Sequence, residues 1–145
     1  FRTDEDHRIL YKHFQELGHT LGEELLIPHR CYYPLLEPVF RHVKGMAHIS
    51  GGGIPGNLPR VLPNGLSAQV NTFSWNVPPI FSLIQNTGAV EPQEMYRVFN
   101  MGLGMILVCS PNQVDTIREK VPEAIIVGEI VPLEEGCGRA VELLA

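Results

Sequence analysis

Three consecutive glycines at positions 51–53 are the feature that most restricts how this chain of 145 residues folds. They follow the apolar segment 45–50, which predicts a short buried strand, and they precede Asn57, which we expect to cap a short helix over 58–62. Because glycine has no Cβ, the backbone N–H groups of such a loop can approach an anion closely. The same glycines also suit a tight turn from strand to helix without a ligand, and the sequence leaves both interpretations open.

The segment 51–56 also has the Gly-x-Gly-x-x-Gly spacing of dinucleotide-binding loops. Two features argue against that interpretation. Pro55 stiffens the loop where the helix should open, and Asn71 stands where an acidic residue is expected about 20 residues later. The sequence therefore does not support a Rossmann-type site.

The glycines lie in a positive part of an acidic chain. The formal net charge is -5, which argues against a nucleic-acid partner. Residues 38–90, however, contain Arg41, Lys44 and Arg60 and no Asp or Glu. This acid-free segment favours attraction of a phosphate or another small anion, although three bases also fit an ordinary solvated surface.

Helical and strand patterns are mixed along the chain, which predicts one domain over residues 1–145 of the α+β class, a mixed β-sheet flanked by helices. Hydrophobic residues make up 44% of the chain, enough to form a core. Further strands are expected at 67–72, 101–109, 124–131 and 139–144. Helices are expected at 3–17, 78–86, 91–99 and 111–121. In the helical pattern over 28–43, a helix either begins at Pro34 or Pro38 or is kinked there.

Several classes of protein are excluded or disfavoured. No stretch approaches the ~18 apolar residues of a membrane span, and the first 20 residues have no signal-peptide core. The three cysteines are too few and too scattered for a disulfide framework, so we expect a cytoplasmic protein. Motifs for zinc ligation and for a nucleophile elbow are absent, and we expect no metal ligands in this chain.

Two further features point to a site. His48 shares a strand face with Ser50 near the glycines, so it is either a structural histidine or a hydrogen-bond donor or acid–base group. Glu94 and Arg97 have the spacing of an ion pair on a helix, and Asn100 ends that helix. The glycines at 102 and 104 then free the backbone, as at many ligand sites.

These stretches together resemble a known enzyme family. Residues 47–54 and 57–63 are similar to the block AH(I/L)(T/S)GGG…N(I/L)PRVLP of aminoimidazole ribonucleotide synthetase, also called phosphoribosylformylglycinamidine cyclo-ligase. Residues 94–105 are similar to its EMYRTFNxGxGM block, and the segment before them at 21–30 is similar to LLxPTR through Pro28 and Arg30. The resemblance covers roughly residues 21–130 in the family's order and spacing.

The resemblance implies a partial enzyme. Complete members have an N-terminal ATP-binding half and a C-terminal half, and only the second is recognisable here, so we expect the isolated chain to be inactive. In the complete enzyme, ATP phosphorylates the formyl-amide oxygen of formylglycinamidine ribonucleotide, an amidine nitrogen attacks, phosphate leaves and an imidazole ring closes. The implied cofactors are ATP and Mg²⁺. The implied partners are the phosphorylated ribonucleotide, the N-terminal half and a second copy in a homodimer, with neither nucleic acid nor membrane.

The resemblance also implies roles for single residues. His48 would be catalytic, as a donor to developing charge or a proton shuttle. The three glycines would contact phosphate, Asn57 and Arg60 would orient the loop or steer the anion, and the second block would position substrate or brace the loop. The implied substrate- or phosphate-binding residues are Ser50, Gly51, Gly52, Gly53, Asn57, Arg60, Glu94, Arg97 and Asn100.

Two alternatives remain beside this interpretation. One is a non-catalytic binding or scaffold module that keeps the fold. The other is a sister enzyme, such as formylglycinamidine ribonucleotide synthetase, selenophosphate synthetase or the hydrogenase-maturation type. The block of residues 57–63 favours the cyclo-ligase over these sister enzymes.

Overall fold

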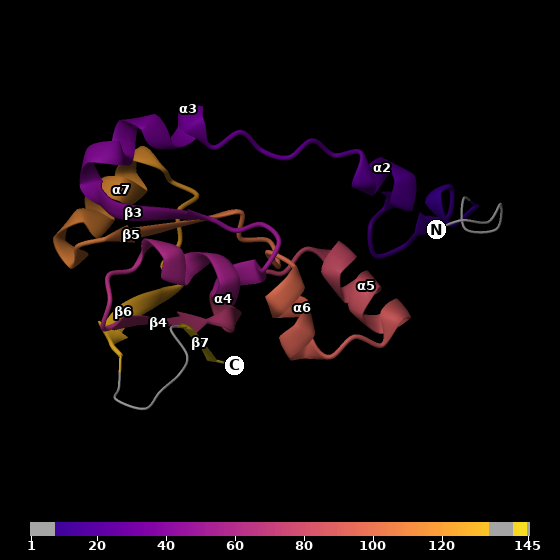
Figure 1. The fold of residues 1–145 in the computed structure, drawn as a ribbon. Coiled ribbons are helices and arrows are strands. Elements are labelled where there is room, and N and C mark those ends of the chain that lie inside the picture. Colours follow the sequence, from indigo (N-terminus) through magenta and orange to yellow (C-terminus); the bar gives the residue numbers. More distant parts are fainter. Residues whose placement is uncertain (1–7, 134–140, 145) are drawn as a thin grey trace.

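A computed structural model describes residues 8–133 and 141–144 (Figure 1). Its centre is an antiparallel pair of strands, β3 (Val43–His48) and β5 (Met105–Cys109). Both predicted strands are present, although β5 begins later than the apolar run starts because residues 101–104 form the turn before it. The two glycine-containing motifs therefore sit at the same end of this strand pair, since His48 is paired with Met105.

A second sheet has three strands in the order β6 (Gly128–Pro132), β4 (Leu66–Asn71) and β7 (Val141–Leu144). Strand β4 pairs antiparallel with β6 and parallel with β7, so the sheet is mixed. The α+β class with a mixed sheet is confirmed, whereas the strands expected in one sheet are divided among separate sheets in the described part of the chain.

The β3–β5 pair is covered on both faces. Helices α3 (Tyr33–Leu36) and α7 (Val114–Lys120) lie on one side, and the three-stranded sheet lies on the other (Figure 1). Alternate side chains of β5 enter two different clusters: Ile106 packs with the residues facing β4, and Leu107 packs against the cluster facing α7. Burial on both faces explains why β5 reads as a continuous apolar run rather than an alternating one.

The two prolines begin helices instead of bending one. Pro34 lies in the first turn of α3, and Pro38 lies in the first turn of the following 3-10 helix η1 (Glu37–His42). A proline is tolerated in a first turn because its missing N–H has no intrahelical partner there. This is one of the two outcomes expected from the sequence.

The helix predicted over 3–17 is wrong from residue 11 onward, while residues 1–7 lie outside the described residues. Short strands β1 (His13–Phe14) and β2 (His19–Thr20) form a hairpin, closed by Gly18 at φ +75°. The N–H of Gly18 donates to the carbonyl of Phe14. Thr20 then caps α2 (Leu21–Leu25) reciprocally with Glu23, a capping box that the sequence contains and that we did not predict.

One of the remaining helices begins in the glycine loop itself. Helix α4 (Gly53–Asn57) runs into the 3-10 helix η2 (Leu58–Val61). The predicted helices at 78–86 and 91–99 are α5 (Pro79–Gly88) and α6 (Pro92–Val98); α6 lies between α4 and α5 in Figure 1. Short 3-10 turns occur at η3 (Thr72–Ser74) and η4 (Pro111–Gln113).

Gly53 is the point where α4 meets α6. Gly53 is buried, has φ +60°, and a Cβ placed on it would overlap the carbonyl oxygen of Tyr96 and approach that of Phe99. Backbone packs directly on backbone here. Glycine is therefore required for steric reasons and not only for its conformational freedom.

Substitution of Gly53 tests this contact. We expect Gly53→Ala to lower the free energy of unfolding by roughly 2–5 kcal/mol, because it adds a left-handed backbone penalty to overpacking against a carbonyl. Gly51→Ala is the matched control, since a Cβ at Gly51 meets nothing within 4 Å, and a change below about 1 kcal/mol is expected. Urea denaturation of both variants measures the difference, and equal losses would contradict the close-packing argument.

Candidate glycine-loop site

The glycine loop connects β3 to α4 through a tight turn. The N–H of Gly53 donates to the carbonyl of Ser50 at 3.0 Å, so this amide is used inside the turn. Gly51 and Gly52 are exposed, and Gly52 has φ +98°. Within the described residues, the N–H groups of Gly51 and Gly52 have no hydrogen-bond acceptor. Two amides of the loop, on exposed residues, thus have no partner in the described structure, and one is used in the turn.

Asn57 holds this loop from the inside. Its side-chain amide donates to three carbonyl oxygens, those of Gly53 at 2.8 Å, Gly51 at 3.2 Å and Ser50 at 3.4 Å. Asn57 is only 7% exposed. The expectation that Asn57 caps a helix is wrong, because its side chain accepts no capping hydrogen bond and is committed to the loop behind it. The loop carbonyls are therefore turned toward Asn57.

His48 lies at the exposed end of β3. Its Nε2 is 3.0 Å from Nε2 of His29, which belongs to the segment between α2 and α3. The ring of Tyr32 lies edge-to-face with both imidazoles. His48 is thus accessible and hydrogen-bonded, not a histidine enclosed in the core.

Glu94 and Arg97 form the helical ion pair that their spacing indicated. Nε and Nη2 of Arg97 each lie 2.6 Å from a carboxylate oxygen of Glu94. The guanidinium's hydrogen bonds lower the pKa of the Glu94 carboxyl and, through the same contact, raise the pKa of Arg97. Both groups reach solvent, so the pair adds little stability by itself.

Asn100 shapes the turn between α6 and β5. Its Oδ1 accepts the N–H of Gly102 at 3.0 Å, and Gly102 has φ +98°. Met101 also has a positive φ, 51°, and its carbonyl accepts the indole N–H of Trp75 at 2.9 Å. Asn100 therefore has a clear local role in bracing this turn.

The structure brings some predicted residues together and leaves others apart. The glycine loop, Asn57 and the end of α6 meet at Gly53. Arg60 is exposed in η2, and across residues 8–133 and 141–144 it forms no hydrogen bond or ion pair. Glu94 and Arg97 bond to each other and to no group of the loop that the structure describes.

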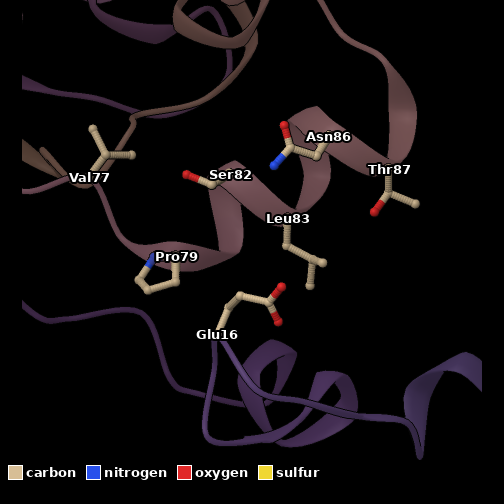
Figure 2. A pocket seen from close by; sticks show the side chains of 7 residues that line it. All are labelled: Glu16, Val77, Pro79, Ser82, Leu83, Asn86 and Thr87. Atoms are coloured by element: carbon tan, nitrogen blue, oxygen red, sulfur yellow. The ribbon is translucent and has the colours of Figure 1, made fainter.

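Two cavities lie away from the predicted site residues. A cavity of about 490 Å³ separates α5 from the N-terminal hairpin, where Glu16 faces Ser82, Leu83 and Asn86 (Figure 2). A more apolar cavity of about 560 Å³ lies between β5, α7 and the segment leading into β6. Neither of these two cavities is lined by a predicted site residue.

The side chains near the glycine loop determine whether it could hold Mg²⁺. Mg²⁺ prefers carboxylate and other hard oxygen ligands. Residues 38–90 carry no Asp or Glu, and in the described part of the chain no three His, Cys, Asp or Glu side chains gather. The glycine loop therefore does not fit a Mg²⁺ site made by this chain alone.

None of the helices described combines the length and apolar character that a membrane crossing needs.

His29 is a site residue that sequence reasoning missed. It was not singled out because it lies 19 positions before His48 in a segment without regular structure. The signal was its place in the motif: where the LLxPTR segment has threonine, this chain has His29 between Pro28 and Arg30.

The fold of this chain is shared with a solved structure. The crystal structure of HypE from E. coli matches with a TM-score of 0.56, covering 85% of this chain and 40% of that chain. The sequence identity is 15%, so this likeness shows the fold alone.

Residues 3–137 match the family model described as "AIR synthase related protein, C-terminal domain", and the chain belongs to this family. It is 50% identical over 115 residues to a phosphoribosylformylglycinamidine cyclo-ligase of Enterococcus faecalis, covering 78% of this chain and 34% of the relative. It is 46% identical over 143 residues to one of Caldicellulosiruptor bescii, covering 94% and 42%. The chain thus spans less than half the length of the curated relatives it matches.

Asn57 provides a test of the loop's internal support. We expect Asn57→Ala to lower the free energy of unfolding by about 1–3 kcal/mol, because it leaves buried carbonyls without a donor. Asn57→Asp should cost more, since a carboxylate offers only acceptors to three carbonyl oxygens. Urea denaturation provides the ranking, with Asn112→Ala in exposed η4 as a neutral control. An Asp variant as stable as the native chain would contradict the assigned contacts.

The ion pair on α6 predicts a pH effect of known sign. Because Arg97 lowers the pKa of Glu94, the pair stabilises the fold above the ordinary carboxyl pKa, and this contribution is lost as the pH falls through the lowered value. In Arg97→Gln the pKa of Glu94 should rise toward its ordinary value. A carbon NMR titration of the Glu94 carboxyl measures it, and an unchanged midpoint would rule out the pair.

Proposed function

We propose that this chain is the C-terminal domain of a phosphoribosylformylglycinamidine cyclo-ligase and supplies one wall of its substrate site. The relatives at 43–50% identity carry that name. The observation that carries the site proposal is the pair of exposed amides at Gly51 and Gly52, close in sequence to the accessible imidazole of His48. Backbone amides that bond only to water are ready to accept an anion's oxygens instead.

The loop's geometry favours an anion over a cation. Asn57 takes the carbonyls of Ser50, Gly51 and Gly53, so oxygen atoms are drawn inward. No carboxylate occurs in residues 38–90, and the exposed guanidinium of Arg60 adds positive charge shortly after α4. A phosphate would meet amide donors and little repulsion at this surface.

The two halves of the protein would contribute different groups to the reaction. A phosphoryl group from ATP converts the formyl-amide oxygen of the substrate into a leaving group, and an amidine nitrogen then closes the ring. Amides of Gly51 and Gly52 would hold the substrate's or the transferred phosphate, and His48 would donate to developing charge or move a proton. Gly53 has no part in binding phosphate, because its amide is bonded to Ser50.

The second motif supports the loop under this proposal. Asn100 braces the turn after α6, and α6 itself packs on Gly53. Glu94 and Arg97 would orient substrate from the exposed face of the same helix. Their ion pair directs the guanidinium toward Glu94 on the helix surface.

The rest of the longer protein completes the function. Its N-terminal half would bind ATP, and the carboxylates for Mg²⁺ would come from there, because this chain's loop offers none. The phosphorylated ribonucleotide would lie between the halves, with a homodimer as the working unit and the cytoplasm as its location. The exposure of His48, Gly51 and Gly52 fits a wall whose opposite side is made by other polypeptide.

The complete protein that contains this chain tests the proposal. We expect His48→Ala to lower kcat for formylglycinamidine ribonucleotide by about 10²–10⁴-fold, the usual contribution of a positioned proton donor. His13→Ala is the control, since His13 is an exposed histidine of the N-terminal hairpin. An unchanged kcat in His48→Ala would remove the catalytic role. ATP-dependent turnover by this chain alone would contradict the division between the halves.

A further inference from the structure

The contact between His29 and His48 restricts which nitrogen of His48 is free. Their Nε2 atoms are 3.0 Å apart, and the ring centroids are 5.1 Å apart at an interplanar angle of 66°. A hydrogen bond between two imidazole nitrogens needs one N–H and one bare nitrogen. The Nε2 of His48 is therefore engaged, and Nδ1 is the nitrogen left for another partner.

We propose that His29 is a positioning residue for His48: its Nε2–H donates to Nε2 of His48, which holds that imidazole in one orientation with its proton on Nδ1, where it can serve the reaction. A neutral imidazole has one donor and one acceptor nitrogen, and the bond at one nitrogen determines the state of the other. A freely rotating, exposed histidine would divide its population among orientations and tautomers. The proposal rests on the proposed catalytic role of His48.

The pair is supported by a third ring. Tyr32 lies edge-to-face with His29 at 5.9 Å and with His48 at 6.3 Å between ring centroids. Tyr32 itself packs on Gly104, where an added Cβ would overlap the hydroxyl. The carbonyl of Gly104 accepts the N–H of Ile49. The three rings therefore lie at the end of the β3–β5 strand pair.

An ion pair ties the segment that carries His29 to the body of the domain. Arg30 lies 2.6 Å from a carboxylate oxygen of Glu123, which follows α7. The guanidinium of Arg30 is also 5.9 Å from the centre of the Tyr32 ring. These contacts on either side of Cys31 anchor a stretch without regular structure close to β3.

The residue at position 29 differs from the family motif that this chain resembles. The LLxPTR segment has threonine where this chain has His29. A threonine side chain is shorter and has no ring to pack edge-to-face with Tyr32 and His48. We therefore look for the effect of His29 in the state of His48 itself.

The first test measures the tautomer of His48 and needs no turnover. In the complete protein labelled with ¹⁵N-histidine, long-range proton–nitrogen spectra should show His48 in a single tautomer. His29→Leu should give a mixture of tautomers, whereas His29→Gln should keep one, because its amide reaches the position of the lost Nε2. His13→Leu is the matched control and should leave the spectrum of His48 unchanged. An unchanged His48 tautomer in His29→Leu overturns the proposal.

The second test measures kcat and KM of the same variants. We expect His29→Leu to lower kcat roughly 10-fold with KM nearly unchanged, and His29→Gln to restore most of the loss. Full kcat in His29→Leu overturns the proposal, and so does His29→Gln as slow as His29→Leu, because an ionisable imidazole would then be required at position 29. If His48→Ala is also fully active, the failure lies in the proposed role of His48, and the spectra still decide whether His29 orients it.

Discussion

The backbone contact of Gly53 with α6 is the constraint on which the candidate site depends. Here the start of α4 lies directly on the carbonyls of Tyr96 and Phe99, with no side chain between them. This approach joins two motifs that are about 40 residues apart in the sequence. Because interiors are close-packed and yield little, the distance between the glycine loop and the end of α6 is set by main-chain atoms.

The carbonyl and amide groups of the glycine loop lie on different sides of it. Asn57 collects three carbonyls on the buried side, and Gly53 uses its own amide in the turn. The amides of Gly51 and Gly52 remain on the exposed side within the described structure. A tight structural turn and an anion-binding loop were alternatives in the sequence. The structure shows the turn, to which Gly53 belongs, and leaves its two neighbours exposed.

Much of the fold follows from local signals. The apolar run of β5, the prolines of α3 and η1, and the Pro78–Pro79 start of α5 all predicted their elements, because propensity and burial agree there. The N-terminal helix was wrong because Leu10, Phe14 and Leu17, which have helical spacing, also fit a short hairpin. Gly18, at positive φ, selects the hairpin. The role of Asn57 was wrong because a capping residue and a loop-bracing residue look alike in sequence.

The sequence by itself determined the residue types at the site: glycines without Cβ, an imidazole beside them, and an absence of acids over residues 38–90. It also determined the family through the order and spacing of its blocks. Only the tertiary structure decided which glycine amide is consumed, that Glu94 and Arg97 satisfy each other, and that His29 meets His48. These outcomes depend on contacts between segments distant in the chain, and a hydrogen bond's partner is chosen by three-dimensional proximity, which no local pattern records.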